Sequence, residues 1–517
     1  MQTVHDLVRL AAARAPKQLA IVDDRSARKL TYAELLAEIE RVAAGFAACG
    51  VKPGGIIATC LPNLYEHALT LLALDRLGAI PALINARLKP DDVGELIHQG
   101  GMSAALVMAD RAAVAAARAA LPERAPIVTM GGALEGTIDF ASLAAAPGSL
   151  APYARPHPDA TAFVFYTSGT TGLPKGAEIP HRAAEPRLLY MATQCGLVHG
   201  THNRVLGLMP LFHVVGFYSV LLAALGLDGT YYVCSAFDPS AVVETIEKRG
   251  ITLVYGTPTH FHALLAAPNF AREKAARVET VVYAGAAMPG PLLERVGAAF
   301  GARLVNIYGT TEIMNALYMP NPVGKPHTYR PGFYSGVRVG RFGGSVHDET
   351  APGEDGELLV DATADATFTR YLNRPEATAA KLQDGWYRTG DIAVRRDDGD
   401  LEVKGRVDDM IISGGENIYP EEVEAALIQH EGVRECSVVG VADQKWGETV
   451  VACIVAKSPG LEEADLDKFL RAGRLADFKR PRTYLFMDEL PKNATNKVLR
   501  RILREKAARA VEPMWST

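Results

Sequence analysis

The chain has 517 residues, more than a single hydrophobic core normally organises, so two or more domains are expected. Apolar residues make up 48% and charged residues 22% of the chain, which is the balance of an ordinary globular protein. Its formal net charge of −5 argues against a nucleic-acid-binding protein, because phosphate backbones require a basic surface.

The cysteines are scattered along the chain and form neither a CxxC pair nor a cluster with histidines at metal-ligand spacing. This pattern is typical of free thiols in a reducing cytoplasm and argues against a disulfide framework or a zinc site. The N-terminus has helical spacing and lacks the long apolar stretch of a signal peptide. We therefore expect a cytoplasmic protein with six unpaired cysteines, Cys49, Cys60, Cys195, Cys234, Cys436 and Cys453.

In the first part of the chain, helical patterns alternate with short β-branched runs. Residues 30–35 open a helix and residues 55–60 read as a strand. The next helix ends near Gly78, and residues 80–85 form another strand. The same order recurs between residues 251 and 284. A strand followed by a helix, repeated in this way, predicts an α/β fold with parallel sheets covered by helices.

The segment from Leu206 to Leu227 contains no Asp, Glu, Lys or Arg, and its length could span a bilayer. However, Pro210, His213 and Gly216 interrupt it. The pattern favours a strand, a turn and a buried helix over a membrane span.

Past about residue 330 the pattern changes to short strands divided by Gly, Pro and Asp, which favours a small antiparallel sheet or barrel. The best boundary follows at residues 406–409, because a new α/β unit begins at Met410. We predict an N-terminal domain over residues 1–407, with its β-rich subdomain at about 331–407, and a small C-terminal domain over residues 408–517.

Residues 166–176, YTSGTTGLPKG, follow an apolar strand at 162–165. Glycines let a backbone approach a phosphate closely, backbone N–H groups and hydroxyls donate to its oxygens, and a lysine adds positive charge. A mobile surface turn is the alternative for such a loop taken alone.

Four further strings accompany this loop: NIYGTTE at 306–312, GWYRTGD at 385–391, GRVDDMIISGGEN at 405–417 and PKNATNK at 491–497. In this order they resemble the adenylate-forming superfamily of acyl- and aryl-CoA synthetases, peptide-synthetase adenylation domains and luciferases. The resemblance covers essentially the whole chain. It implies an ATP-dependent acid–thiol ligase that makes an acyl-adenylate and pyrophosphate, then an acyl-CoA and AMP.

The resemblance also implies an ATP site. Glu312 would take Mg²⁺, since a hard cation prefers oxygen ligands, and Thr311 would hold a phosphate oxygen. Asp391, after a glycine and a predicted tight turn, would accept hydrogen bonds from the ribose hydroxyls, and Arg406 would join it. The implied ATP and AMP residues are Thr167, Ser168, Gly169, Thr170, Thr171, Gly172, Lys175, Tyr308, Gly309, Thr310, Thr311, Asp391 and Arg406.

Lys497 is the residue expected to catalyse adenylation, with a lesser role for Lys492. A cation between the carboxylate and the α-phosphate lowers their repulsion and stabilises the charge of the transition state. In this family the C-terminal domain rotates between an adenylation and a thiolation pose, and Asp408 occupies the hinge position. After the rotation, residues 413–417 would line a pantetheine tunnel.

Coenzyme A needs cations for its phosphates and contacts for its pantetheine arm. The resemblance to aryl-CoA ligases places the CoA contacts at Arg87, Gly414, Gly415, Glu416, Trp446, Phe478, Arg480 and Arg482. An ordinary exposed turn is the alternative for the residues at 478–482. The basic helix at 497–509 could add to the field around CoA, although such a helix is more often a solvated face.

For the acid itself, the strings LMPLFHVVGF and IYGTTEIMNALYM resemble the bacterial 4-chlorobenzoate–CoA ligases and their benzoate relatives. The implied pocket is compact and largely apolar, which suits a flat ring. Its lining would be Tyr190, His213, Val214, Val215, Tyr255, Ala284, Gly285, Ile307, Gly309, Met314 and Asn315.

Two positions in this pocket depart from the chlorobenzoate pattern. Tyr190 and Tyr255 stand where phenylalanines are expected, and two phenols in an apolar pocket need partners. We therefore expect a ring with a polar substituent such as hydroxyl, methoxyl or amino, unless buried water satisfies the phenols. His213, after a strand end at 209–212, would be a gate that clears for the carboxylate, or else a satisfied core histidine.

Other functions share parts of these motifs. A ligase for a short or medium aliphatic acid or a dicarboxylic acid has the same ATP strings. So do an enzyme that loads a carrier protein, a luciferase-like oxygenase and a non-catalytic adenylate-binding module. We expect ATP, CoA, Mg²⁺ and a small carboxylic acid as partners, no nucleic acid and no membrane span, with a homodimer possible because relatives commonly dimerise.

Overall fold

The computed structural model describes residues 2–145, 150–167, 174–325, 327–473, 475–492 and 498–511. It divides into two compact units. The larger unit comprises Met1–Val337 and Val360–Tyr387, and the smaller unit comprises Arg338–Leu359 and Arg388–Thr517. The α/β fold class predicted from the sequence is confirmed. The domain boundary predicted at residue 408 stays a prediction. The predicted hinge at Asp408 also stays a prediction.

One sheet of the larger unit has its described strands in the order β19-β9-β8-β4-β3-β5-β6-β7. The strands from β8 to β7 in this order pair in parallel, whereas β9 pairs antiparallel with β8 and β19. Helices α4 and α5 cover one of its faces, where their apolar side chains pack on the sheet. The bounds are β3(Ile56–Cys60), β4(Ile80–Leu83), β5(Ala104–Met108), β6(Ile127–Met130), β7(Ile138–Asp139), β8(Thr161–Thr167), β9(Lys175–Pro180), β19(Arg370–Tyr371), α4(Pro90–Gln99) and α5(Arg111–Ala120).

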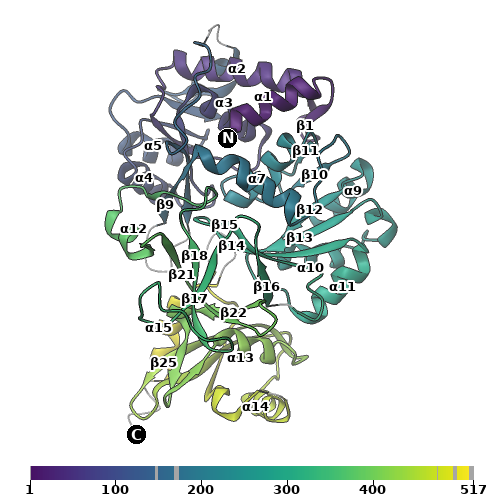
Figure 1. The fold of residues 1–517 in the computed structure, drawn as a ribbon, viewed down its shortest axis with the longest axis vertical. Helices are drawn as coiled ribbons and strands as arrows, with labels where there is room; N and C mark the ends of the chain where they lie inside the picture. The colour runs from purple at the N-terminus through teal and green to yellow at the C-terminus, as the bar shows by residue number, and fades with distance from the viewer. Residues whose placement is uncertain are drawn as a thin grey trace. The chain divides into compact units, whose positions relative to one another are not determined.

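The other sheet of the larger unit contains the run β16-β15-β14-β13-β12-β10-β11-β1-β2. The strands from β14 to β1 pair in parallel, and β15, β16 and β2 add antiparallel edges. Helices α9, α10 and α11 pack on one face of this sheet (Figure 1). The bounds are β1(Leu19–Asp23), β2(Arg28–Thr31), β10(Arg204–Gly207), β11(Thr230–Val233), β12(Leu253–Gly256), β13(Thr280–Ala284), β14(Arg303–Thr310), β15(Met314–Pro320), β16(Thr328–Pro331), α9(Pro239–Arg249), α10(Pro258–Ala266) and α11(Gly290–Phe300).

The remaining helices of the larger unit include a layer that contacts both sheets. The Phe217 ring of η2 lies 4.5 Å from the Phe163 ring of β8, and η2 also packs on β10 of the other sheet. The bounds are α1(Val4–Arg14), α2(Tyr32–Ala48), α3(Tyr65–Leu77), α6(Phe140–Ala145), η1(His181–Ala183), α7(Ala184–Thr193), η2(Val215–Leu222), α8(Ala223–Gly226), η3(Arg272–Ala275) and α12(Pro375–Lys381), with the short strand β20(Leu382–Gln383).

Helix α2 begins where the sequence predicted. The Thr31 hydroxyl accepts a hydrogen bond from the Glu34 backbone N–H, and the Glu34 carboxylate accepts one from the Thr31 N–H at 2.8 Å. This reciprocal cap satisfies backbone donors that the first turn of a helix leaves open. The predicted helix end at Gly78 is also correct, since α3 stops at Leu77.

The uncharged segment from Leu206 to Leu227 forms the predicted strand, turn and buried helix. Its helical part differs from the expectation in one respect, because η2 is a π-helix that continues into α8. The helix lies in the core, with Phe217, Tyr218 and Leu222 buried. Across the described residues, no helix combines the length and the apolar character that crossing a membrane requires.

The smaller unit holds two groups of strands. The strands β17, β18, β21 and β22 follow one another in that order, and β21 and β22 form an antiparallel hairpin, as the short-strand pattern predicted. The other sheet has the order β24-β23-β26-β25, with β27 parallel to β26. The bounds are β17(Val337–Gly340), β18(Asp355–Asp361), β21(Trp386–Arg395), β22(Leu401–Arg406), β23(Ile411–Ser413), β24(Glu416–Ile418), β25(Val433–Asp443), β26(Gly447–Ala456) and β27(Thr483–Phe486).

Helices cover the second of these sheets on two sides. Val423 of α13 and Leu466 of α14 pack into one core cluster, and Leu503 of α15 packs into another. The Arg500 guanidinium anchors α15 through ion pairs with Asp409, Glu421 and Glu424. The helical bounds are η4(Val407–Asp409), α13(Pro420–Leu427), α14(Glu463–Ala472), η5(Asp477–Lys479) and α15(Arg500–Val511).

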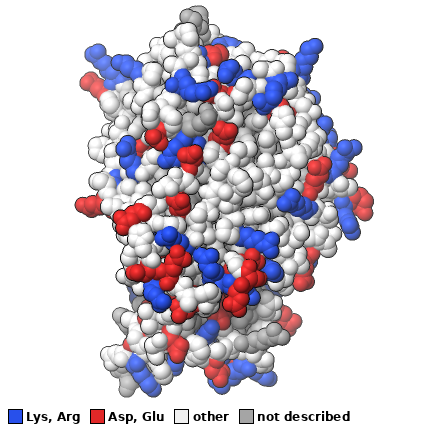
Figure 2. All heavy atoms as spheres, in the orientation of Figure 1, with Lys and Arg blue, Asp and Glu red and all other residues white. Residues whose placement is uncertain are grey.

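The cysteines and the surface charges follow the sequence analysis. All six cysteines lie in the described residues and are free, as predicted. On the face drawn in Figure 2, Lys and Arg side chains are interspersed with Asp and Glu.

Candidate active site

Thr311 and Glu312 lie in the turn between β14 and β15. The turn is tight, because a Cβ added at Gly309 would overlap the Met314 carbonyl group. Met314 takes a φ of 55°, a left-handed value that is uncommon for a non-glycine residue. The surrounding contacts therefore have to hold this backbone in place.

The Glu312 carboxylate is fixed inside this turn. Its side chain is almost fully buried, and Oε1 accepts a hydrogen bond of 2.6 Å from the Tyr371 hydroxyl. Within the described residues, Oε2 accepts no hydrogen bond. An ionisable carboxylate with one oxygen held and the other available matches the oxygen ligands that Mg²⁺ prefers. The predicted metal-binding role of Glu312 is therefore chemically consistent with its surroundings.

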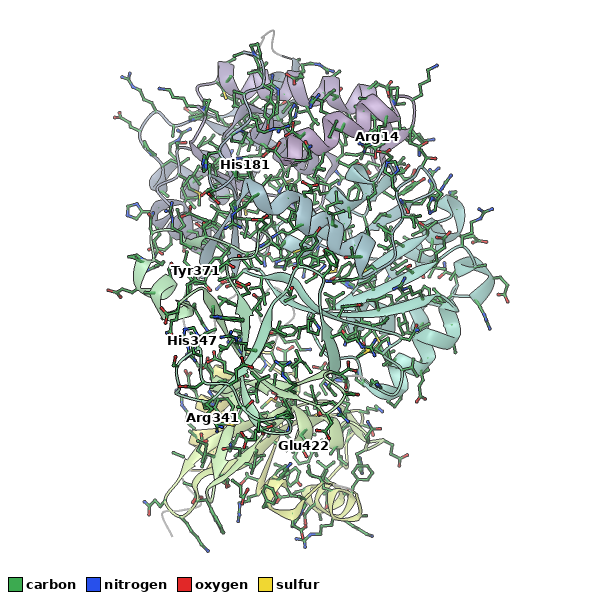
Figure 3. All side chains as sticks on the ribbon, viewed as in Figure 1. Arg14, His181, Arg341, His347, Tyr371 and Glu422 are labelled. Atoms are coloured by element: carbon green, nitrogen blue, oxygen red, sulfur yellow. The ribbon has the colours of Figure 1, made fainter. Side chains whose placement is uncertain are left out.

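Lys175 lies near the same tyrosine. Its Nζ atom is 5.4 Å from the centroid of the Tyr371 ring, whose hydroxyl group bonds Glu312 (Tyr371 is labelled in Figure 3). Lys175 opens β9 directly opposite Thr167, the last residue of β8, and the two strands pair antiparallel. The predicted residues Ser168, Gly169, Thr170, Thr171 and Gly172 lie outside the described residues, and so does Lys497.

The predicted acyl-pocket residues converge on one face of the second sheet of the larger unit. Ala284 of β13 pairs in register with Ile307 of β14, and Tyr255 of β12 pairs with Val282 of β13. Because alternate side chains of a strand point to opposite faces, Tyr255, Ala284 and Ile307 share the face opposite the helices α9 to α11. They lie toward the carboxyl ends of parallel strands, where ligands bind in open α/β sheets.

The two tyrosines that depart from the chlorobenzoate pattern differ in their partners. The Tyr190 hydroxyl forms a hydrogen bond of 3.1 Å with the Ser335 hydroxyl, and its ring lies edge-on to Tyr334 with centroids 5.7 Å apart. The Tyr255 hydroxyl is buried and has no hydrogen-bond partner within the described residues. Burying a phenol hydroxyl without a hydrogen-bond partner costs free energy. Tyr255 is therefore the better indicator of a polar group on the substrate.

The rest of the predicted pocket lies close to these elements along the chain. Asn315 of β15 is buried and donates a hydrogen bond of 3.1 Å to the Ser219 hydroxyl of η2. Gly285 follows β13 directly, Val214 immediately precedes η2 and Val215 is its first residue. Tyr308, Gly309 and Thr310 are the last three residues of β14.

His213 is half-buried beside Phe212, with ring centroids 4.8 Å apart. Burial, assisted by the positive charge of Arg87, lowers the pKa of His213 to about 4, so its imidazole is neutral at pH 7. The predicted strand end at 209–212 is wrong, because β10 stops at Gly207. The Asn63 side-chain amide takes the place of a neighbouring strand: it donates to the Gly207 and Met209 carbonyls and accepts from the Leu211 N–H at 2.7 Å.

In the smaller unit, Asp391 and Arg406 lie directly opposite each other on β21 and β22. Arg406 donates to the Asp391 carboxylate at 3.2 Å and to the Thr389 carbonyl, and the Asp391 N–H donates to the Thr389 hydroxyl. The sequence predicted a tight turn before Asp391; a tight turn lies at residues 384–385, between β20 and β21, and not directly before Asp391. The strand runs through Gly390, whose φ is 76°, because cross-strand pairing continues on both sides of it.

Some of the predicted CoA-binding residues form a cluster in the smaller unit. The Arg482 guanidinium lies 4.1 Å from the centroid of the Trp446 ring, and the Gly414 N–H donates a hydrogen bond of 2.7 Å to the Trp446 carbonyl. Gly415 and Glu416 are exposed beside Gly414. The prediction made no allowance for the ion pairs of Arg480, which bonds both Asp467 and Asp477.

The other predicted residues have these surroundings. Phe478 is exposed, with the Lys479 ammonium 5.5 Å from its ring centroid. Arg87 of the larger unit is also exposed. Lys492 forms an ion pair of 2.6 Å with Glu435. The carbonyl of Asp408 accepts a hydrogen bond of 2.9 Å from Arg504 of α15, while its carboxylate is exposed.

Three residues near the predicted site were not predicted from the sequence: Tyr371, Arg187 and Asn63. Each acts through a side chain that reaches a backbone or carboxylate group far along the chain. No residue pattern in the sequence signals such a contact. Only the fold places Tyr371 against Glu312 or Asn63 against residues 207–211.

Comparisons with known proteins give the class of enzyme. The family model described as AMP-binding enzyme matches residues 8–372, and the one described as AMP-binding enzyme C-terminal domain matches residues 422–497. A 4-chlorobenzoate–CoA ligase from Arthrobacter sp. is 45% identical over 509 residues, which cover 98% of this chain and 95% of that protein.

Two solved structures are similar over nearly the whole chain. An anthranilate CoA ligase in complex with anthranoyl-AMP has a TM-score of 0.89 and 25% identity, covering 99% of this chain and 98% of its own. The o-succinylbenzoate CoA synthetase of Bacillus subtilis, in complex with ATP and a magnesium ion, has a TM-score of 0.85 and 28% identity, covering 96% and 98%.

The chain therefore belongs to the AMP-binding enzyme family. The matches also confirm the finer prediction from the sequence, an AMP-forming acid–CoA ligase that works through an acyl-adenylate.

Proposed function

We propose that this chain is an ATP-dependent aryl-acid–CoA ligase whose acid is a substituted benzoate. In the first step the acid's carboxylate oxygen attacks the α-phosphorus of ATP and pyrophosphate leaves. In the second step the CoA thiolate attacks the acyl carbon and AMP leaves. No general base is needed for the first step, because a benzoate is already ionised at pH 7.

The observation that carries the proposal is the sheet face formed by Tyr255, Ala284 and Ile307, next to the turn that holds Glu312. A tyrosine ring, an alanine and an isoleucine on one face of three neighbouring strands suit an aromatic ring better than a long alkyl chain. The similarity to a 4-chlorobenzoate–CoA ligase and to an anthranilate CoA ligase, both named for ring acids, supports the same choice.

Mg²⁺ fits this proposal through Glu312, whose Oε2 is available within the described residues. When bound with ATP, the cation would neutralise charge on the triphosphate. Tyr371 would keep the Glu312 carboxylate in place, and Lys175 would add positive charge near the phosphates. Thr310 and Thr311 would supply hydroxyl groups to phosphate oxygens.

The remaining roles are proposed by family resemblance. Lys497 would stabilise the transition state of adenylation. Asp391 and Arg406 would bind the ribose, since both ends of their cross-strand pair can form hydrogen bonds. Of the predicted CoA contacts, the Trp446 and Arg482 stack is the best supported, because it presents an aromatic surface and a cation together.

The ring substituent follows from the phenols. Of these two phenols, Tyr190 already bonds Ser335, whereas the Tyr255 hydroxyl has no partner within the described residues. We propose that a hydroxyl, methoxyl or amino group of the acid bonds Tyr255. The matched variants are Tyr255→Phe and Tyr190→Phe: the first should reduce kcat/KM for a hydroxybenzoate about tenfold relative to benzoate, and the second should change that ratio less than about twofold.

The test of the proposed function is AMP formation with and without CoA, over a panel of acids. The panel contains benzoate, chloro-, hydroxy-, methoxy- and aminobenzoates, malonate and octanoate. CoA-dependent AMP formation with a benzoate would support the proposal. Turnover confined to malonate or octanoate would contradict the aromatic substrate and the pocket assignment. Equal loss for all benzoates in Tyr255→Phe would contradict the role of its hydroxyl group.

A further inference from the structure

Arg187 of α7 is fully buried, with 0% of its surface exposed. Burial lowers the pKa of its guanidinium to about 10, so the group remains charged at neutral pH. A buried charge is costly unless its donors are satisfied. Over the described parts of the chain, no carboxylate lies within ion-pair distance of Arg187, so the cost must be offset by other contacts.

Those contacts go to the turn that carries Glu312. Nη2 donates to the backbone carbonyls of Thr311 at 3.2 Å and Glu312 at 3.3 Å, and Nη1 lies 3.8 Å from the Met314 sulfur. The guanidinium carbon also lies 5.1 Å from the Tyr218 ring centroid, a cation–π contact. One side chain thus holds three residues of the turn, including the strained Met314.

Arg187 also holds the segment that supplies the Tyr371 hydroxyl group. Its Nε donates to the Ala366 carbonyl at 2.8 Å, and two residues later the Phe368 N–H donates to the Glu312 carbonyl at 2.8 Å. Tyr371 then donates to the Glu312 carboxylate. The guanidinium therefore ties together the two segments that set the position of Glu312.

We propose that Arg187 is a positioning residue that fixes the Glu312 carboxylate for the Mg²⁺ bound with ATP. It acts through the backbone of the turn and through the segment 366–371, and it touches neither metal nor substrate. The inference rests on the proposed function, because it assigns Glu312 the role of metal ligand. The opposing account is that Arg187 only stabilises the fold.

Three variants separate these accounts. Arg187→Met removes the charge and every donor at similar length. Arg187→Lys keeps the charge but cannot reach all the carbonyls at once. Tyr371→Phe removes the hydroxyl group that donates to the Glu312 carboxylate. Arg76→Met is the matched control, because Arg76 is also a buried arginine with an ion pair to Glu40 and a ring contact with Tyr153, 5.7 Å away.

Two measurements are made on each full-length variant. The first is the Mg²⁺ dependence of acid-dependent ATP–pyrophosphate exchange at fixed ATP. The second needs no turnover: it is the rise in Tm produced by ATP with Mg²⁺, compared with ATP and a chelator, in the absence of acid. The KM for CoA in the complete reaction is measured as an internal reference.

We expect Arg187→Met to raise the Mg²⁺ concentration at half-maximal exchange about tenfold, and to shrink the Mg²⁺-dependent rise in Tm, because hydrogen bonds from a charged donor are lost. Arg187→Lys and Tyr371→Phe should show smaller shifts in the same direction. Arg76→Met should lower Tm without moving the Mg²⁺ midpoint, and the KM for CoA should stay within about twofold in all variants.

An unchanged Mg²⁺ midpoint in Arg187→Met, with a lowered Tm, would overturn the inference and leave Arg187 a structural residue. If Arg187→Met does not fold, an unchanged midpoint in both Arg187→Lys and Tyr371→Phe overturns it instead. Failure of the proposed function is distinguishable: the wild-type protein would then show no exchange with any benzoate. The Mg²⁺-dependent rise in Tm would still report on Arg187.

Discussion

The turn from Gly309 to Asn315 in the larger unit and the segment around Gly414 in the smaller unit are stabilised in different ways. Residues 312–315 of the turn are buried, and Arg187 and Tyr371, which lie far along the chain, hold this part of the turn from outside. Gly414 is exposed and bonds to Trp446, which stacks on Arg482 within the same small unit. The partners of the exposed segment, Trp446 and Arg482, are among the residues predicted from the sequence, whereas Arg187 and Tyr371 lie outside every motif.

The largest effect on the adenylation rate should follow a substitution of Glu312 in the turn of the larger unit. Glu312→Gln keeps an oxygen that can accept from Tyr371 but removes the negative charge, so the fold should be retained. We expect the adenylation rate to fall at least about 100-fold, because a charged oxygen ligand of Mg²⁺ is lost. ATP–pyrophosphate exchange measures the rate, and thermal unfolding measures the retained fold. A loss smaller than threefold would show that Glu312 does not bind the metal.

Asp391→Asn should have a smaller effect on nucleotide binding. The asparagine keeps an acceptor for Arg406 but weakens hydrogen bonds to a ribose, so the KM for ATP should rise about tenfold. Asp398→Asn, in the exposed turn of the same hairpin, is the control and should leave KM unchanged. Equal KM values for the two variants would contradict a ribose-binding role for Asp391.

Gly414→Ala tests the exposed segment around Gly414 in the smaller unit. Gly414 has a φ of 62°, and a Cβ there would lie 3.0 Å from the Trp446 ring. Gly415→Ala is a matched control, because Gly415 has a φ of 84° but its Cβ would meet nothing within 4 Å. Both variants carry backbone strain of about 1–2 kcal/mol, so only the difference between them reports on the ring.

We expect Gly414→Ala to raise the KM for CoA several-fold more than Gly415→Ala, with the KM for ATP unchanged in both. Steady-state kinetics with CoA varied and then ATP varied measure the two constants. Identical effects of the two variants on CoA would show that the position of Trp446 does not matter for thiolation.

The smallest effect concerns the stability of the larger unit. Asp75 is buried beside His5 and His181; its carboxylate accepts from the His5 N–H at 2.9 Å and lies 3.6 Å from the His181 ring nitrogen (His181 is labelled in Figure 3). Burial raises the pKa of Asp75 to about 7 and lowers those of His5 and His181 to about 4.

The signs of these shifts oppose each other. The raised pKa of Asp75 contributes stability that is present below pH 4 and is lost as the pH rises through 7. The lowered pKa values of His5 and His181 contribute stability that grows as the pH rises from 4 to 6.5. Asp75→Asn removes only the first contribution, so the variant should gain stability relative to wild type as the pH rises from 5 to 8, by at most about 1.4 kcal/mol per pH unit.

Thermal unfolding at pH 5, 6, 7 and 8 measures this difference for Asp75→Asn. The exposed Asp159 supplies the control variant Asp159→Asn, which should follow wild type at every pH. A difference between Asp75→Asn and wild type that stays constant with pH would contradict a raised pKa for Asp75.

Local signals in the sequence predicted much of the fold. The start of α2 within residues 30–35 and the end of α3 near Gly78 depend on residues close together in the chain, and both predictions are correct. The uncharged segment from Leu206 to Leu227 was correctly assigned to the core, because Pro210 and Gly216 interrupt it.

The failed or missing predictions involve long-range contacts. The strand end near Gly207 depends on the amide of Asn63, and β21 continues past Gly390 because it pairs with β22 from Asp391 onward. The position of Glu312 depends on Arg187, which lies 124 and 125 residues before the carbonyls it bonds. Periodicity and motif spacing carry no information about such partners.

The most direct test of the account is a single-turnover experiment with excess enzyme, ATP and a substituted benzoate, quenched and analysed by mass spectrometry. We predict an aroyl-adenylate and pyrophosphate in the absence of CoA, and conversion of that adenylate to aroyl-CoA and AMP when CoA is added. Pyrophosphate release without an aroyl-adenylate, or an adenylate that CoA does not consume, would contradict an aryl-acid–CoA ligase.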